Sequence, residues 1–170
     1  IHKFGIPFEI PEEVEAEAKK VHDLPVTAEK REDLRHLPII AIDPRDARDF
    51  DDAVWATPDD DPKNTNGFKA IVAIADVSYY VRPGSALDRE AAKRGNSVYF
   101  PDRVVPMLPH ALSSDKCSLR ANEDRAVLAC HMQIDAGGHV TSWRFTRAIA
   151  RMSANIPYQD AQDAIDFAED

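Results

Sequence analysis

The stretch "FKAIVAIADV", residues 68–77, is apolar almost without interruption and rich in β-branched side chains. A short apolar run of this kind is typical of a strand buried within a sheet. We therefore predict a central strand that lies in the core. The preceding residues, 58–67, read "PDDDPKNTNG" and consist mostly of turn-forming residue types. They predict a loop in which Asp59, Asp60 and Asp61 are solvated.

Further strands are predicted on both sides of this run. Residues 37–43, "LPIIAID", form a short apolar run and predict a buried strand that ends at Asp43. A short strand is expected at 97–100, followed by an irregular, proline-rich segment. The segments 125–135 and 139–150 flank "AGG", which predicts a β-hairpin.

Four helices are predicted around these strands. An acid-rich helix is expected at 11–21, where Pro11 suits a first turn, and a second at 27–35 behind the candidate cap Thr27. A third helix is predicted at 85–95, "SALDREAAKRG", because this segment has a capping serine at its start and a glycine at its end. Pro157 opens an amphipathic helix that runs to the end of the sequence. Strands and helices alternate irregularly, so the predicted class is α+β (mixed α/β).

Composition narrows the classes of partner. The 170 residues suit one domain, and a hydrophobic content of 44% is ample for a single core. The formal net charge is −9, from 30 acidic and 21 basic residues. This is the wrong sign for a protein that binds nucleic acid by its own charge. A polyanionic partner would need divalent cations held by the aspartates, or basic modules outside this chain.

The cysteines and the apolar runs predict a cytoplasmic protein. Cys117 and Cys130 lack the spacing of a zinc site and are too few for a disulfide framework, which favours a reducing compartment. No stretch approaches eighteen apolar residues, and the beginning of the sequence lacks a signal-peptide pattern. We therefore expect no membrane partner.

The stretch "AIDPRDARDFDDAVWA", residues 41–56, raises the question of chemistry because carboxylates at such short spacing repel one another. Its five aspartates are Asp43, Asp46, Asp49, Asp51 and Asp52. One interpretation is a helix in which Asp43 is the cap, Pro44 the first residue and arginine–aspartate pairs support the turns. A calcium loop of the EF-hand type fails sooner, because Ala53 occupies a position that requires an oxygen ligand.

The other interpretation is a site for a hard cation. In an extended segment Asp49 and Asp51 share a face about 6 to 7 Å apart, while Asp52 points to the opposite side, so a bend is needed to bring all three together. Asp43, at the end of a neighbouring strand, could supply the opposing ligand. Magnesium prefers carboxylate oxygen, relieves the repulsion and supports phosphodiester hydrolysis. The spacing alone leaves the helix and the metal site both open.

A resemblance decides between them. The stretch "IDPRDARDFDDAV" closely resembles the active-site signature of the ribonuclease II/ribonuclease R family, the RNB-domain exoribonucleases. The following "VAIADVSYYVRPGSALDREAAKRGNSVYFPDRVVPMLPHALSSDKCSL" is similar to the adjoining family core, in register and closest to the ribonuclease R branch. The resemblance implies a mixed, mainly antiparallel sheet with flanking helices.

The resemblance also implies an activity. Members of the family hydrolyse single-stranded RNA processively from the 3′ end, with Mg²⁺ as cofactor, and release nucleoside 5′-monophosphates. By position, Asp43, Asp49, Asp51 and Asp52 match the four catalytic, metal-binding aspartates, whereas Asp46 matches a non-catalytic site. Asp43 and Asp52 correspond to direct ligands of the main metal ion. Asp49 and Asp51 correspond to the second metal and water positions.

Two tyrosines are matched to RNA-binding positions of the family. Tyr99, in "NSVYFP", corresponds to an aromatic residue that stacks near the terminal nucleotides. Stacking of this kind tolerates any base, as a nonspecific degrading enzyme requires. Tyr158 corresponds to a tyrosine close to the substrate end. No DNA partner is expected, and no oligomeric state is predicted.

The resemblance divides the chain into two parts. Residues 1–37 resemble the lead-in from a preceding RNA-binding region, and residues 38–170 resemble the N-terminal half of the catalytic domain. In the family the second half supplies a catalytic arginine and a glutamate near the metal, and no residue here corresponds to them. The predicted function is therefore that of a 3′-to-5′ exoribonuclease, of which this chain is a part. The alternative is a noncatalytic RNA-binding or scaffold protein that keeps the fold.

Overall fold

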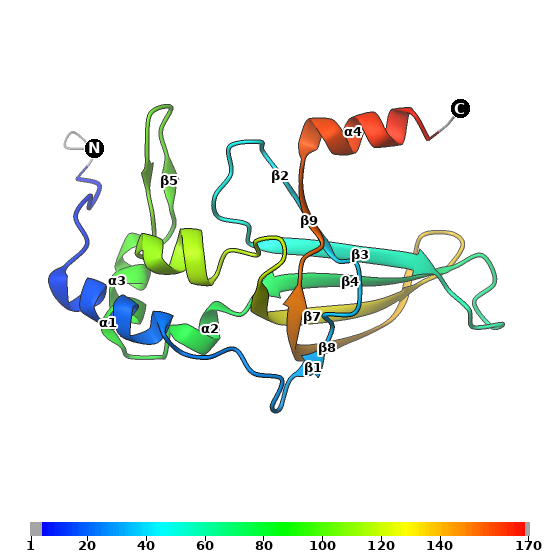
Figure 1. Ribbon diagram of the computed structural model, residues 1–170, viewed down its shortest axis with the longest axis horizontal. Helices are drawn as coiled ribbons and strands as arrows, with labels where there is room; N and C mark the ends of the chain where they lie inside the picture. The colour runs from blue at the N-terminus through cyan, green and yellow to red at the C-terminus, as the bar shows by residue number, and fades with distance from the viewer. Residues whose placement is uncertain (1–4, 169–170) are drawn as a thin grey trace.

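A computed structural model describes residues 5–168 and is built around one mixed sheet (Figure 1). Its seven strands follow the order β1-β8-β7-β4-β3-β2-β9. They are β1 (Glu32–Asp33), β2 (Ile40–Asp43), β3 (Asp52–Pro58), β4 (Phe68–Ala75), β7 (Asp124–Ile134), β8 (Val140–Arg151) and β9 (Ala154–Pro157). The neighbours from β8 to β2 pair in antiparallel fashion, whereas β1 and β9 join the two edges in parallel. The predicted α+β class, with a mainly antiparallel sheet, is confirmed.

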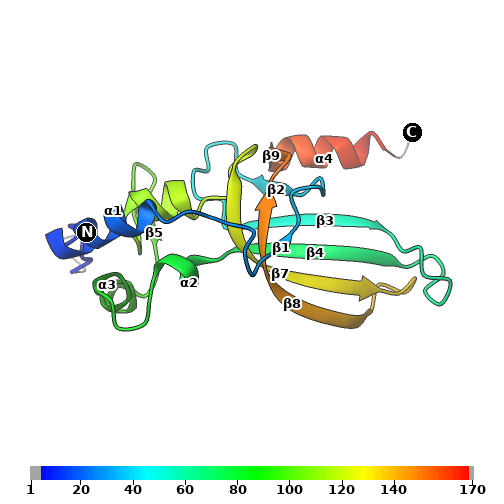
Figure 2. The same ribbon diagram turned by 60° about the horizontal axis from the view of Figure 1, so that its bottom comes forward.

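Most of the helices gather at one end of the sheet, and the long strands extend away from them, whereas the last helix follows β9 and lies apart (Figures 1 and 2). The helices are α1 (Glu12–His22), α2 (Val77–Tyr80), α3 (Ala86–Arg94), the π-helical segment η2 (Leu112–Lys116) and, after β9, α4 (Tyr158–Asp166). A separate hairpin is formed by β5 (Val98–Tyr99) and β6 (Val104–Val105). Within residues 5–168, none of the helices combines the length and the apolar content needed to cross a bilayer.

Strand β4 occupies the centre of the sheet, as its sequence predicts, but only one of its faces is in the core. Ala73 pairs with Ala53 of β3 and Ala129 of β7, and all three are fully buried. Phe68 and Ile74, on the opposite face, remain exposed. The expectation of a strand in the core is therefore wrong for that face, because α1, α2 and α3 lie at one end of the sheet and do not cover it.

Most of the predicted elements are confirmed. The hairpin around "AGG" is formed by β7 and β8, and the short strand near residue 98 is β5. Helix α3 begins after Ser85, whose hydroxyl accepts a hydrogen bond from the Asp88 amide, and ends at Gly95, which has a φ of 80°. This is the capping that its sequence predicts. Helices α1 and α4 begin directly after Pro11 and Pro157.

Two further sequence predictions are wrong. The helix expected at 27–35 is absent from the described structure, because Glu32 and Asp33 instead pair with β8 and Leu34 enters the core. Lys30 has a φ of 60°, in the left-handed region, which is incompatible with a continuous right-handed helix just before this strand. The Asp59 side chain is enclosed rather than solvated, because its carboxylate accepts hydrogen bonds from Asn64 and Gln133. These hydrogen bonds lower the pKa of Asp59.

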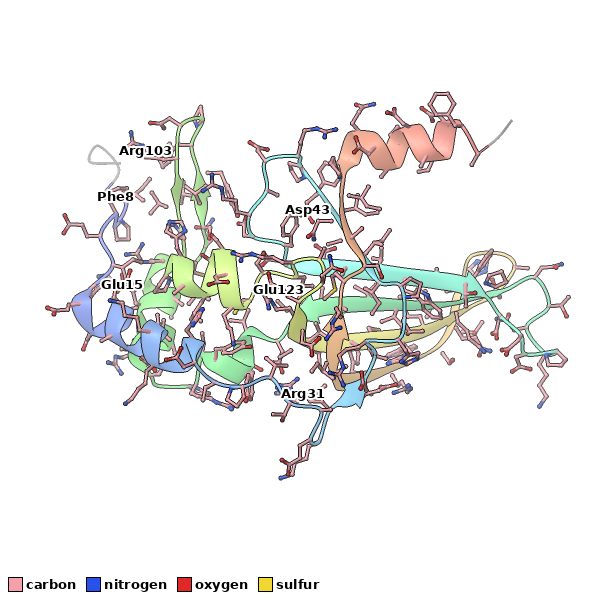
Figure 3. All side chains as sticks on the ribbon, viewed as in Figure 1. Phe8, Glu15, Arg31, Asp43, Arg103 and Glu123 are labelled. Atoms are coloured by element: carbon pink, nitrogen blue, oxygen red, sulfur yellow. The ribbon has the colours of Figure 1, made fainter. Side chains whose placement is uncertain are left out.

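A buried carboxylate ties the end of β4 to both the β1 segment and β8. Asp76 is 5% exposed and accepts hydrogen bonds from Arg31 at 2.8 Å, Arg147 at 2.7 and 3.0 Å, and Ser78 at 2.7 Å. Arg31 is labelled beside β1 in Figure 3. Burial alone would raise the pKa of Asp76, but the hydrogen bonds and the two guanidinium charges outweigh it and hold the pKa below its usual value.

The Asp76 network predicts a large effect on stability. In Asp76→Ala, the Arg31 guanidinium stays buried without its carboxylate, which destabilises a protein by about 3–5 kcal/mol. Urea unfolding should show this loss. The matched control is Asp60→Ala, which removes an exposed carboxylate that pairs with Lys69 and should cost at most about 1 kcal/mol. Equal midpoints for the two variants would contradict the prediction.

Candidate active site at the ends of strands β2 and β3

The aspartate-rich stretch forms the connection between two adjacent strands. Strand β2 ends at Asp43, and β3 begins at Asp52. Between them the Ala47 amide donates to the Pro44 carbonyl at 3.0 Å, which closes a turn, and residues 48–51 belong to no helix or strand. The helix interpretation of this stretch is therefore wrong. Asp46 lies in the turn and is exposed.

The antiparallel pairing brings the two ends of this connection together. Ile40 of β2 faces Val54 of β3, so the same register continued toward the turn places Asp43 across from Asp51. On the other side the Ala75 amide donates to the Asp51 carbonyl at 2.9 Å, which extends the pairing of β3 with β4 by one residue. Asp43 is labelled in Figure 3, at the end of β2 beside the path from β9 into α4.

The four predicted aspartates form one electrostatic cluster. The pKa of Asp43 is raised by burial and by the negative charges of Asp52 and Asp49. The pKa of Asp51 is raised by the protein atoms around its carboxylate and by the charges of Asp49, Asp43 and Asp52. Each of the four therefore acts on at least one of the others over a short distance. The four residues that the sequence predicts thus lie within electrostatic reach of one another, and their role as a metal site stays a prediction.

The cluster has the donor chemistry that a hard cation requires. The Oδ2 atom of Asp43 is buried and has no hydrogen-bond partner. An ionised, buried oxygen without a partner is costly, and a bound cation would satisfy it. Among residues 5–168, no three acidic, histidine or cysteine side chains are yet grouped closely enough to hold an ion. Metal binding therefore requires the carboxylates to draw closer together.

Tyr99 contacts the cluster from the β5–β6 hairpin. Its hydroxyl donates a hydrogen bond of 2.5 Å to Oδ2 of Asp49, and this bond is the main cause that raises the pKa of Tyr99 to about 12. The residue is nevertheless 62% exposed, so its ring is accessible for stacking. The sequence predicts Tyr99 near the site, but the hydrogen bond to a candidate metal ligand is an additional finding.

Tyr158 lies on the other side of the cluster. It is the first residue of α4 and follows Pro157, which pairs with Asp43 in the parallel register of β2 and β9. Its side chain is exposed. The turn and the helix are also joined by an ion pair of 2.5 Å between Arg45 and Asp160. Of the two predicted tyrosines, Tyr99 bonds to an aspartate of the cluster, whereas Tyr158 follows the β9 residue that pairs with Asp43.

Most of the arginines near the site are already paired. An open hollow of about 700 Å³ borders the segment between β2 and β3 and includes Arg48 and Arg120 in its lining. Arg120 forms an ion pair of 3.2 Å with Asp115. Arg125 is buried and pairs with Glu123 at 2.5 Å. These ion pairs reduce the free positive charge around the site, and among the described residues the exposed Arg48 forms no ion pair.

Sequence inspection missed one residue that contacts the site segment. Ser118 is separated from Phe50 by 68 positions, yet its hydroxyl bonds to the backbone on both sides of Asp49. It belongs to the stretch "SSDKCSL", which resembles the family core without pointing to any individual residue. No local pattern identifies such a long-range contact.

The chain is similar to known proteins in sequence. Residues 31–170 match the RNB domain. The chain is 48% identical over 162 residues to Ribonuclease R of Acidithiobacillus ferrooxidans, covering 94% of this chain and 36% of that protein. It is 45% identical over 154 residues to Ribonuclease R of Escherichia coli, covering 91% of this chain and 17% of that protein. The chain thus spans well under half the length of these relatives.

Solved structures share the fold. Mycoplasma genitalium RNase R in complex with ribose methylated single-stranded RNA matches with a TM-score of 0.86 and 32% identity, over 96% of this chain and 25% of that one. Yeast Ssd1, described as a pseudonuclease, matches with a TM-score of 0.73 and 21% identity, over 84% of this chain and 18% of that one. At that level of identity the second match concerns the fold alone.

The raised pKa values predict how Asp51→Asn changes thermal stability. When folding raises the pKa of a carboxyl group, the free energy of unfolding of the protein falls as the pH rises above the unfolded pKa of that group. At pH 7 the ionised Asp43 and Asp51 therefore both destabilise the folded state. Without divalent cations, Asp51→Asn should therefore unfold at a higher temperature than the wild type. The excess should shrink below pH 4, where the wild-type carboxyl groups are protonated.

Added Mg²⁺ should reverse this order. At about ten times its Kd, a ligand stabilises a protein by about 1.4 kcal/mol, which is about 3–6 °C for a chain of this size. The wild type should gain this increment and Asp51→Asn should not, whereas the control Asp46→Asn in the exposed turn should respond like the wild type. An equal response of Asp51→Asn would contradict the assignment of Asp51 to the metal site.

Proposed function

The chain belongs to the RNB-domain family, and from this we propose that it forms part of a Mg²⁺-dependent 3′-to-5′ exoribonuclease that hydrolyses single-stranded RNA to nucleoside 5′-monophosphates. One observation carries the proposal above the others. Four aspartates that repel one another are held together at the ends of β2 and β3, and one of them has a buried oxygen without a partner. Such an arrangement is unfavourable unless it binds a cation.

The relatives support the choice of reaction. Proteins named Ribonuclease R share 45–48% identity with most of this chain. A structurally similar RNase R was solved with single-stranded RNA, and another structure of it with double-stranded RNA. Because the chain spans only part of these proteins, their activity and their RNA partners enter here as the proposal.

In this proposal the four carboxylates have two different roles. Asp43 and Asp52 hold the main metal ion, while Asp49 and Asp51 serve the second metal position and the attacking water. Bound Mg²⁺ supplies activation of that water and stabilisation of the leaving oxygen. Asp49 suits the role of orienting a small ligand, because one of its oxygens is already fixed by the Tyr99 hydroxyl and the other remains available.

The two tyrosines supply the proposed contacts to RNA. Their rings are exposed on either side of the aspartates, Tyr99 on the hairpin and Tyr158 at the start of α4. Stacking on aromatic rings holds a base without reading its identity. With a net charge of −9, the chain needs the metal ions and basic surfaces beyond this chain to hold the phosphates. A cytoplasmic location is part of the proposal and fits the two free cysteines.

The second candidate is a noncatalytic protein that binds RNA or serves as a scaffold. The observation in its favour is that a pseudonuclease shares the fold. The fold therefore does not require catalysis, and the decision rests on the side chains at the site. All four aspartates are present here and electrostatically coupled, which favours the enzyme.

A degradation assay tests the proposal. The purified protein is incubated with Mg²⁺ and single-stranded RNA labelled at its 5′ end, and the products are resolved by length. We expect shortening from the 3′ end with release of nucleoside 5′-monophosphates, and a loss of at least about 100-fold in Asp51→Asn because a metal position loses its charge. Asp46→Asn is the control and should keep full activity. RNA binding without cleavage by the wild type would favour the noncatalytic candidate.

Two substitutions of Tyr99 separate its two contacts. Tyr99→Ala removes the ring and should weaken binding of single-stranded RNA by about 1–3 kcal/mol, the contribution of one stacked base. Tyr99→Phe keeps the ring and removes only the hydrogen bond to Asp49, so it should retain RNA affinity. Fluorescence anisotropy with Ca²⁺ in place of Mg²⁺ measures affinity without turnover. Equal affinities of wild type and Tyr99→Ala would exclude a stacking role.

A further inference from the structure

The Ser118 side chain forms hydrogen bonds to the backbone on both sides of Asp49. It is completely buried in the segment that follows η2. The hydroxyl donates to the Arg48 carbonyl at 2.8 Å and accepts from the Phe50 amide at 3.1 Å. A serine hydroxyl has one proton to donate, and here it satisfies two backbone groups that flank a single residue. The peptide units before and after Asp49 are thereby held in one arrangement.

The segment that Ser118 contacts, residues 47–51, forms few other hydrogen bonds. Residues 47–51 belong to no helix or strand, so regular hydrogen bonding does not hold them. Three other backbone hydrogen bonds hold the segment: the Ala47 amide donates to the Pro44 carbonyl, the Leu119 amide to the Phe50 carbonyl at 2.8 Å and the Ala75 amide to the Asp51 carbonyl at 2.9 Å. The Tyr99 hydroxyl bonds to the Asp49 side chain and not to its backbone. Of these anchors, only the Ser118 hydroxyl spans both sides of Asp49.

Ser118 is itself held firmly. The Arg125 Nε atom donates to its carbonyl at 2.7 Å, and its own amide donates to the Asp115 carbonyl at 3.0 Å. Arg125 is buried and is fixed in turn by the Glu123 carboxylate at 2.5 Å. A continuous set of hydrogen bonds therefore runs from Glu123, labelled in Figure 3, to the backbone of Asp49.

We propose that Ser118 is a positioning residue for the metal site, which fixes the backbone of Asp49 so that its carboxylate faces Asp43, Asp51 and Asp52. This inference rests on the proposed function. The charges of the other aspartates push the Asp49 carboxylate away, and a loop would yield to that force. The buried hydroxyl opposes this movement from the inner side of the loop, without touching metal or substrate.

The test compares Ser118→Ala with Ser118→Cys and Val14→Ala in the purified protein. Ser118→Ala leaves the Phe50 amide without a partner. Ser118→Cys keeps a side chain of similar size but has only a weak donor and acceptor, so it serves if the alanine variant is poorly folded. Val14→Ala removes core volume in α1 and controls for a general loss of stability.

Two measurements do not depend on activity. Hydrogen exchange of the Phe50 amide should be at least tenfold faster in both Ser118 variants than in the wild type, because its acceptor is lost or weakened. The Mg²⁺ concentration at half saturation, followed by isothermal titration calorimetry without RNA, should rise about tenfold. Val14→Ala should change neither. In the RNA assay the Ser118 variants should lower kcat and leave KM for RNA unchanged.

The outcomes separate this inference from the proposed function. If the wild type binds Mg²⁺ and both Ser118 variants bind it equally well, the positioning role is overturned while the proposed function stands. If the wild type binds no Mg²⁺ and Asp51→Asn changes nothing, both are overturned. If Val14→Ala weakens Mg²⁺ binding as much as the Ser118 variants do, the effect is one of general stability and the positioning role is again overturned.

Discussion

The repulsion among four carboxylates at the ends of β2 and β3 is the constraint to which the surrounding structure responds. No arginine or lysine neutralises Asp43, Asp49, Asp51 or Asp52 within the described residues, so their side chains do not hold the group together. The backbone does so instead, through the β2–β3 pairing, the Ala75 amide and the Ser118 hydroxyl. These neutral hydrogen bonds can oppose the repulsion because their partners belong to a packed core. They also add no charge that would compete for a cation at the site.

The fold supplies that anchor at one end of the sheet. The helices pack there, and Asp76 joins the end of β4 to the β1 segment and to β8 through two arginines. The far ends of the long strands are different: Phe68, Trp143 and Phe145 are exposed there. The buried core is therefore unevenly distributed along the sheet. The aspartate segment is held by hydrogen bonds to this core rather than by being buried in it.

The sequence predicts much of this because most elements are defined by local patterns. The apolar run of β4, the hairpin around "AGG" and the caps of α3 depend on neighbouring residues, and each is confirmed. The helix expected at 27–35 fails because a parallel pairing with β8, more than a hundred residues away, overrides local propensity. The prediction of a solvated Asp59 is wrong for the same reason, since its hydrogen-bond partner Gln133 lies on β7, far away in the sequence. The four aspartates are found because they are close in the sequence, whereas Ser118 is close to them only in space.

The contact between Tyr99 and Asp49 limits how the site can bind a cation. The hydroxyl occupies one lone pair of Oδ2 of Asp49, so while the hydrogen bond persists Oδ1 is the less encumbered oxygen for a metal. A ligand with one oxygen suits Mg²⁺, which takes single oxygens at octahedral positions and keeps several waters. Binding through both oxygens would make the metal and the Tyr99 hydroxyl share Oδ2. One hydrogen bond thus couples the exposed ring, which is placed to stack on a base, to the way in which the neighbouring carboxylate can bind metal.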